Sequence, residues 1–224
     1  EYLMNVVDYL FEASNGEKQM ELKQAIQELR KSDKRNFSQS FDLLISLKGI
    51  DVKKDNITTV VSIPNKVKDK KVCAFLSKRT EIVKTVTNLE FPKYKDAKEL
   101  KRLVKNFDFF IAEAKLMPSV ATAFGKALGP TGKMPSPQLG VLMSSDDNSI
   151  KQLLAKIDNS IKVRVREPAI KLSIGNEKMS DEQIISNVMA VYTGVVASLP
   201  TKKENIKSIM LKLTMSKPIK VEIK

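Results

Sequence analysis

The residues that come closest to a known chemical motif are Gly132 and Lys133, in the glycine- and proline-rich segment Leu128–Gly140. A phosphate-binding loop needs glycine, any four residues, then glycine, lysine and serine or threonine, because backbone amides and the lysine hold phosphates while the hydroxyl holds magnesium. Here Met134 follows Lys133, and Ala127 stands where the first glycine is required. Both ends of the motif fail, so the segment predicts a shaped loop, neither helix nor strand, and not a nucleotide-hydrolysing site.

The composition argues against most catalytic and metal-binding chemistry. The chain has no histidine, which is the commonest general base and metal ligand. Its one cysteine, Cys73, cannot form an internal disulfide or a zinc-binding cluster, and the apolar run Val72–Leu76 around it is typical of a buried thiol. We therefore expect no catalytic residues, no metal and no cofactor, and the cysteine usage favours a reducing, cytoplasmic setting.

The net charge points to a polyanionic partner. Lys and Arg number 39 against 26 Asp and Glu, a net charge of +13, which favours nucleic acid first and an anionic membrane surface second. The most apolar stretch, Ile184–Leu199, is shorter than the roughly 20 residues of a membrane span, and Ser186 and Asn187 interrupt it. No membrane partner and no secretory signal are expected.

The two ends of the chain share one strand pattern, an alternation of apolar and polar residues that is typical of half-buried antiparallel strands. This pattern predicts strands at residues 41–47, 57–63, 163–174 with a break at Pro168, and 209–223. Helical spacing of apolar residues predicts helices at 2–13, 17–31 and 181–198. Ser180 and Gln183 have the spacing of a capping box at the start of the last helix.

The middle of the chain has a different pattern, in which short continuous apolar strands alternate with helices. Strands are expected at 71–76 and 106–112, and helices at 79–88, 95–105, 119–128 and 150–157. Such alternation predicts a small parallel sheet with helices on both faces. We therefore expect two domains of mixed α/β and α+β class: a discontinuous outer domain, residues 1–66 plus 160–224, with an antiparallel sheet and helices, and an inserted α/β domain, residues 67–159.

Three strings in this order resemble the signature motifs of one family. Lys34–Leu44 is similar to its N-terminal motif of a basic residue, Phe and a strand of alternating aliphatics. Leu128–Gln138 is similar to its signature loop, and Leu213–Lys220 to its C-terminal Thr-Met-Gly motif. The family is the universal large-subunit ribosomal protein L-one family of side-stalk proteins, here of archaeal type. The resemblance covers about residues 18–224, and residues 1–16 lie outside it.

The resemblance implies a fold and a set of partners. In the family both chain ends form one RNA-binding domain, and the inserted domain is Rossmann-like, although no dinucleotide motif follows a strand here. The implied function is that of a structural constituent of the large ribosomal subunit. It binds the side-stalk ribosomal RNA, assists release of exit-site transfer RNA and represses its own messenger RNA by binding a leader that imitates the ribosomal site. A monomer is expected away from the ribosome.

The resemblance also implies an RNA-binding site made by the two terminal motifs. Cations there would neutralise phosphates, and hydroxyls would meet the 2′-OH that marks RNA. From the residues alone, Phe37 could equally be a core aromatic, Met215 a strand core residue, and the cations a solvated turn. The carried-over residues are Lys34, Arg35, Phe37, Ser38, Thr214, Met215, Ser216 and Lys217.

Two further expectations concern single residues. Ser216 stands where the family has glycine, so its added Cβ predicts retained binding with an adjusted contact. Lys133 and the charge of residues 67–159, which hold 17 basic and 10 acidic residues, offer a second RNA surface on the inserted domain.

Two other functions compete with the ribosomal one. One is a nucleotide-dependent enzyme built on the inserted α/β domain, against which the missing histidine and the incomplete phosphate loop argue. The other is a scaffold that binds only protein, which would bind its partner without RNA and without salt sensitivity.

Overall fold

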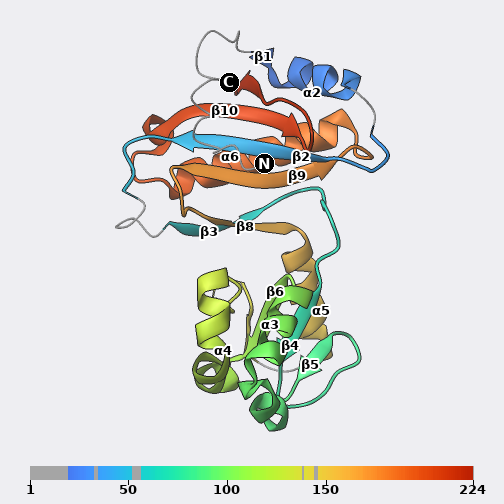
Figure 1. Cartoon of the computed structure of the whole chain (residues 1–224), viewed down its shortest axis with the longest axis vertical. Coiled ribbons are helices and arrows are strands. Elements are labelled where there is room, and N and C mark those ends of the chain that lie inside the picture. Colours follow the sequence, from blue (N-terminus) through green and yellow to red (C-terminus); the bar gives the residue numbers. More distant parts are fainter. Residues whose placement is uncertain (1–19, 33–34, 52–56, 138, 144–145, 224) are drawn as a thin grey trace. The chain divides into compact units, whose positions relative to one another are not determined.

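The computed structural model describes residues 20–32, 35–51, 57–137, 139–143 and 146–223 (Figure 1). The chain divides into two compact units. The outer unit joins the residues up to Val67 with those from Lys162 onward, and the inserted unit is Lys68–Ile161. The helix expected at 2–13 lies outside the described residues.

The outer unit is built around a five-stranded sheet in the order β1-β11-β10-β2-β9. Within it, β2 (Ser40–Leu47) pairs antiparallel with β10 (Ile206–Leu213) and with β9 (Ala169–Asn176). β11 (Ile219–Glu222) pairs antiparallel with β10, and the short β1 (Met20–Glu21) adds in parallel at the edge. Both neighbours of β2 thus come from the far end of the sequence, which is the antiparallel sheet expected of the outer domain.

Two helices complete the core of the outer unit. α2 (Leu22–Lys31) buries Leu22, Ala25, Ile26 and Leu29, and α6 spans Asp181–Ser198, the range predicted from sequence. The capping box at the start of α6 is confirmed, since the Gln183 amide donates to Ser180 Oγ (3.3 Å) and the Ser180 amide to Gln183 Oε1 (3.1 Å). A separate two-stranded sheet pairs β3 (Thr58–Ser62) with β8 (Ser160–Arg164), and α6 packs on β3. A single turn of 3₁₀ helix, Lys202–Asn205, leads from α6 to β10.

The inserted unit has a parallel four-stranded sheet in the order β5-β4-β6-β7. The strands are β4 (Val72–Phe75), β5 (Lys84–Val86), β6 (Phe109–Glu113) and β7 (Val141–Leu142), and β4 is buried along its whole length. The helices are α3 (Ala97–Asn106), α4 (Met117–Thr131) and α5 (Asp147–Asp158), with 3₁₀ segments at Asn88–Lys95 and Ala114–Leu116. Continuous burial of short parallel strands is what an α/β sheet covered on both faces requires.

Aromatic side chains fill the core of the inserted unit. Phe75 stacks on Phe110 with ring centroids 5.7 Å apart, and Phe91 meets Phe124 edge to face at 5.1 Å. Such offset and edge-on pairs are favoured over face-to-face stacking. Cys73 belongs to the same core cluster and is fully buried, and this burial raises the pKa of its thiol to about 12. The thiol is therefore a packing group, as the apolar run around it indicated.

The helix predicted at 79–88 is wrong. Within that range the chain bends and then forms β5, because Val83, Thr85 and Val86 are β-branched and prefer a strand. The helical turn starts only at Asn88, where Thr87 and Glu90 form a capping box. The spacing of apolar residues alone does not distinguish a helix from a strand in this range.

The glycine- and proline-rich segment is helical for longer than expected. α4 continues through Pro130 and Thr131 and ends at Gly132, whose φ of 74° is left-handed. The Gly132 amide donates to the Gly129 carbonyl (3.0 Å) and the Lys133 amide to that of Leu128 (3.1 Å), a common helix-ending arrangement. The shaped loop therefore begins at Gly132 and not at Leu128.

No helix among the described residues is both long and apolar enough to cross a membrane. Within the same residues, no group of three or more Asp, Glu or Cys side chains is placed to hold a metal ion.

Candidate nucleic-acid interface

The sheet of the outer unit brings the two terminal motifs together. Because Phe41 pairs with Leu213 across β2 and β10, the residues before β2 and after β10 lie at the same end of the sheet. The Ser40 amide donates to Thr214 Oγ1 (3.0 Å), and the Thr214 amide donates to the Ser40 carbonyl (3.1 Å). Residues separated by 174 positions in the sequence thus become direct neighbours. We call the described residues Arg35–Ser40 and Leu213–Lys217 the motif apex.

A third segment, the loop between β9 and α6, is hydrogen-bonded to the apex. Gln39 is 2% exposed, and its Oε1 accepts the Met215 amide at 3.1 Å. On its other side, Glu177 accepts the Gln39 backbone amide (2.9 Å) and side-chain amide (3.3 Å) with its two carboxylate oxygens. The Glu177 amide also donates to the Gln39 carbonyl (3.0 Å). The loop between β9 and α6 is therefore joined to both motifs through one buried glutamine.

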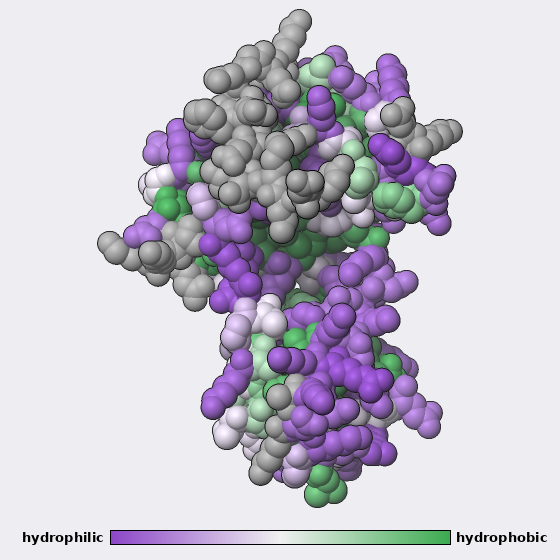
Figure 2. All heavy atoms as spheres, viewed as in Figure 1, coloured by the Kyte–Doolittle hydropathy of each residue, from purple (hydrophilic) through white to green (hydrophobic). Residues whose placement is uncertain are grey.

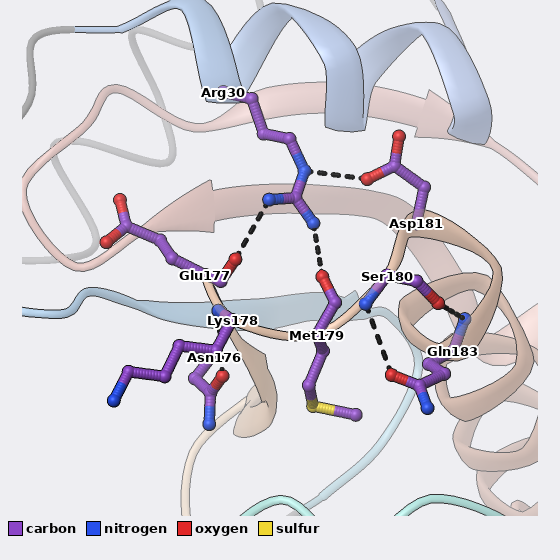
Figure 3. A network of polar contacts seen from close by, with 8 residues as sticks. All are labelled: Arg30, Asn176, Glu177, Lys178, Met179, Ser180, Asp181 and Gln183. Atoms are coloured by element: carbon purple, nitrogen blue, oxygen red, sulfur yellow. Dashed lines mark hydrogen bonds and ion pairs between the residues drawn. The ribbon is translucent and has the colours of Figure 1, made fainter.

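Arg30 of α2 fixes that loop (Figure 3). Its guanidinium donates to Asp181 Oδ1 (2.6 Å), to the Glu177 carbonyl (2.9 Å) and to the Met179 carbonyl (2.5 Å). The guanidinium also lies 5.6 Å from the centre of the Phe41 ring. One planar group with several donors in a fixed geometry thus holds three points of one short loop.

The apex presents two large apolar side chains to solvent. Phe37 is 51% exposed and Met215 is 62% exposed, so the core positions considered for them from sequence are wrong. Arg35, Ser38 and Lys217 are exposed beside them, and within the described residues Arg35 and Lys217 form no ion pair. Exposed aromatic and apolar groups beside such cations suit an RNA chain, which offers base and sugar faces along with phosphates. Lys34 lies outside the described residues.

The two hydroxyls of the C-terminal motif have structural roles. Thr214 Oγ1 accepts the Ser40 amide, and Ser216 Oγ accepts the Leu213 amide at 2.8 Å. Among the described non-glycine residues only Lys202 has a positive φ, so the backbone at Ser216 needs no glycine. The Ser216 hydroxyl closes the turn, and the backbone there has no left-handed conformation that would disfavour a side chain.

The comparison with known families covers all residues of the motif apex. The model of the Ribosomal protein L1p/L10e family matches residues 29–217. The chain belongs to this family. It is 36% identical to the protein named "Large ribosomal subunit protein uL1" of Methanocaldococcus jannaschii, with 90% of this chain and 94% of that protein covered. The proteins of the same name from Thermofilum pendens (34% identical; 89% and 92% covered) and Nanoarchaeum equitans (32%; 88% and 97%) are also similar.

Membership in this family bears on the competing functions. It is a family of ribosomal proteins and not of enzymes, which goes against the nucleotide-dependent enzyme. The relatives named here are all archaeal, in agreement with the archaeal type indicated by the motifs.

Lys133 has a structural role in this family member. Its ammonium donates to the carbonyls of Val104 and Phe107, each at 2.7 Å, at the C-terminal end of α3. The last carbonyls of a helix have no helical partner and carry partial negative charge, so a half-buried lysine satisfies them. Contact between Lys133 and RNA stays a prediction, and this geometry does not favour it.

Sequence reasoning missed a basic stripe on α3. Lys98, Lys101, Arg102 and Lys105 follow the spacing i, i+3, i+4 and i+7, which places them on one face of the helix. None of the four side chains forms an ion pair within the part of the chain that the structure describes. Figure 2 shows mostly hydrophilic side chains over the part of the inserted unit where α3 lies. This spacing of basic residues can be read directly from the sequence.

The support of the apex was also missed, for a different reason. Gln39 lies inside the N-terminal motif but carries no charge or ring that would mark it. Glu177 is 138 residues away from Gln39, and no short-range pattern connects them. Only the pairing of β2 with β9 brings the two residues together.

Proposed function

We propose that this chain is a constituent of the large ribosomal subunit and binds the ribosomal RNA of the side stalk through the motif apex. The observation that carries the proposal is that two exposed apolar side chains, Phe37 and Met215, stand on segments that pair at one end of the outer sheet. Beside them lie Arg35 and Lys217, which have no ion-pair partner among the described residues. The names of the similar archaeal proteins support the ribosomal assignment. This ribosomal assignment places the protein on ribosomes in the cytoplasm.

Each exposed group of the apex has a physical counterpart in RNA. Arg35 and Lys217 neutralise phosphates, which positions the protein without reading sequence. Phe37 packs on a ribose or an unstacked base, a contact worth about 1–3 kcal/mol when the aromatic group is removed. Ser38 offers a hydroxyl for the 2′-OH, whereas Thr214 and Ser216 shape the backbone on which these groups stand.

Titration of a side-stalk ribosomal RNA fragment tests the proposal. Phe37→Ala is expected to weaken binding about tenfold, or about 1.4 kcal/mol, because it removes an exposed ring from the interface. Met215→Ala should act in the same direction. Binding is measured by fluorescence anisotropy at several salt concentrations, with a transcript of the Methanocaldococcus jannaschii stalk as the probe.

Two control variants carry matched changes on the inserted unit. Leu89 is 91% exposed and Met143 is 87% exposed, so Leu89→Ala and Met143→Ala remove apolar surface of similar kind from residues that are not part of the apex. Both should bind the RNA like the wild type. Weak binding that vanishes with moderate salt and ignores the apex variants would contradict the proposal, because it would show only general attraction to a basic protein.

The proposal extends to two further RNAs. The α3 stripe, whose four cations form no ion pair with the rest of the described chain, supports contact between the inserted unit and exit-site transfer RNA during its release. The same apex would bind a leader of the chain's own messenger RNA that imitates the stalk, so that free protein represses its synthesis. Affinity for such a leader must be lower than for the ribosomal fragment, and tighter binding to the leader would contradict this feedback.

A further inference from the structure

The polar chain beneath the motif apex has a fixed direction. Glu177 as a carboxylate can only accept hydrogen bonds, and it accepts both the backbone and the side-chain amide of Gln39. The side-chain nitrogen of Gln39 must therefore face Glu177. Its oxygen is left facing the apex, where it accepts the Met215 amide. The acceptor character of Glu177 thus decides which end of the Gln39 amide meets the turn.

We propose that Glu177 and Gln39 are positioning residues for RNA binding, which act by holding the Met215 turn in its binding geometry. The inference rests on the proposed function of the apex. Met215 is exposed, and its backbone amide is anchored by this relay, defined as Glu177, Gln39 and the Met215 amide. Preorganised groups bind more tightly because less conformational freedom is lost on association.

The surroundings make the relay rigid. Gln39 is almost fully buried, so a wrongly oriented amide could not be satisfied by water. The backbone of Glu177 is held by Arg30, and the Asn176 side-chain carbonyl accepts the Lys178 amide at 3.0 Å in the same loop (Figure 3). These hydrogen bonds hold the backbone around Glu177 in place in the free protein, before RNA binds.

Simple electrostatics and the relay make opposite predictions for Glu177→Gln. Removing a negative charge near an RNA surface should strengthen binding if charge alone matters. In the relay, a glutamine at position 177 can accept the Gln39 backbone amide but then turns its own NH₂ group toward that of Gln39. If Gln39 rotates to relieve this conflict, its NH₂ group meets the Met215 amide, so one hydrogen bond is lost either way.

The relay predicts that affinity for the stalk RNA fragment falls about tenfold in Glu177→Gln, at a temperature well below unfolding. The Met215 amide should also exchange its hydrogen faster in the free protein, as measured by NMR. Glu182→Gln removes the same charge from an exposed position near the start of α6 and serves as the matched control. It should leave affinity unchanged or slightly raised.

Exchanging the residues at positions 39 and 177 tests whether the relay, and with it RNA binding, can be restored. Gln39→Glu alone places two carboxylates within hydrogen-bonding distance and should weaken both folding and binding. With Glu177→Gln added, the new carboxylate at position 39 accepts both the new side-chain amide at position 177 and the Met215 amide. The new amide oxygen at position 177 accepts the backbone amide of position 39. The double variant should recover most of the wild-type affinity and the protection of the Met215 amide.

The outcomes separate the inference from the function on which it rests. If the wild-type protein binds the stalk RNA no better than the apex variants do, the proposed function is wrong, and the relay then has no role in RNA binding. Wild-type binding that Glu177→Gln leaves unchanged or strengthens overturns the relay alone. Failure of the swapped pair to recover binding while its melting temperature returns to normal also overturns it, because the two residues would then serve folding only.

Discussion

At the scale of single residues, several polar side chains have supporting roles inside the protein, which separates them from the exposed side chains proposed to bind RNA. Thr214, Ser216 and Lys133 all use their polar atoms inside the protein. Glu113 does the same at the end of β6, where its carboxylate accepts the Ser77 hydroxyl (2.7 Å) and amide (3.1 Å). The hydroxyl bond holds the pKa of Glu113 below its ordinary value, and burial acts in the opposite direction.

The lowered pKa of Glu113 determines how the stability of the fold changes with pH. A carboxyl whose folded pKa is depressed stabilises the fold above its unfolded pKa, and this contribution is lost as pH falls through the folded value. Ser77→Ala should therefore cost about 1 kcal/mol of unfolding free energy at pH 7. The difference from wild type should shrink below about pH 4. Urea unfolding across pH measures this, with Ser119→Ala on the exposed face of α4 as control; a difference that stays constant with pH would contradict it.

Lys133→Met tests the second supporting role. The change keeps the apolar stem but removes the donors to the last carbonyls of α3, so unfolding free energy should fall by about 1–3 kcal/mol. Affinity for the stalk RNA should stay within about twofold, because the apex is untouched. A large loss of transfer RNA affinity with unchanged stability would instead support the second RNA contact expected for Lys133 from sequence.

At the scale of elements, the packing of α6 on β3 depends on the absence of a side chain. A Cβ at Gly194 would lie 2.6 Å and 2.7 Å from the two methyl carbons of Val61, closer than packed carbon atoms approach. Gly194→Ala should therefore destabilise the outer unit by about 1–3 kcal/mol, although alanine is the better helix former. Gly125 of α4 has nothing within 4 Å of the same position, so Gly125→Ala should stabilise by about 0.5–1 kcal/mol. Thermal unfolding of the two variants should shift in opposite directions; equal shifts would contradict the packing argument.

The elements also show where sequence patterns succeed and fail. The bounds of α6 agree with the sequence prediction to the residue because a capping box and helical spacing coincide. Those of β2 agree within one residue because apolar and polar residues alternate along it. The error at 79–88 arose where β-branched residues happened to fall at helical spacing. In the apex, the exposed motif residues could be proposed from local strings, whereas Glu177 required knowledge of strand pairing that a single sequence does not carry.

At the scale of the whole molecule, the net charge of +13 includes the cations of two features proposed to face RNA, the apex and the α3 stripe. Lys101→Gln with Lys105→Gln should weaken binding of transfer RNA at low salt and lower the salt dependence by about one to two released counterions. Stalk RNA binding should be unaffected. Lys151→Gln with Lys156→Gln removes equal charge from α5 in the same unit, and an equal effect of this control on transfer RNA would contradict a specific role for α3.

The pairing of β2 has a consequence for biosynthesis. This strand is made early, but its partners β9 and β10 leave the ribosome only after the whole inserted unit has been synthesised. During that interval the inserted unit, whose described parallel strands pair only among themselves, can fold first, while β2 waits with both edges unpaired. Since Thr214 follows Ser40 by 174 residues, the proposed RNA site can form only after both β2 and β10 have been synthesised. A nascent chain that lacks β10 therefore lacks the proposed site and cannot compete for its RNA.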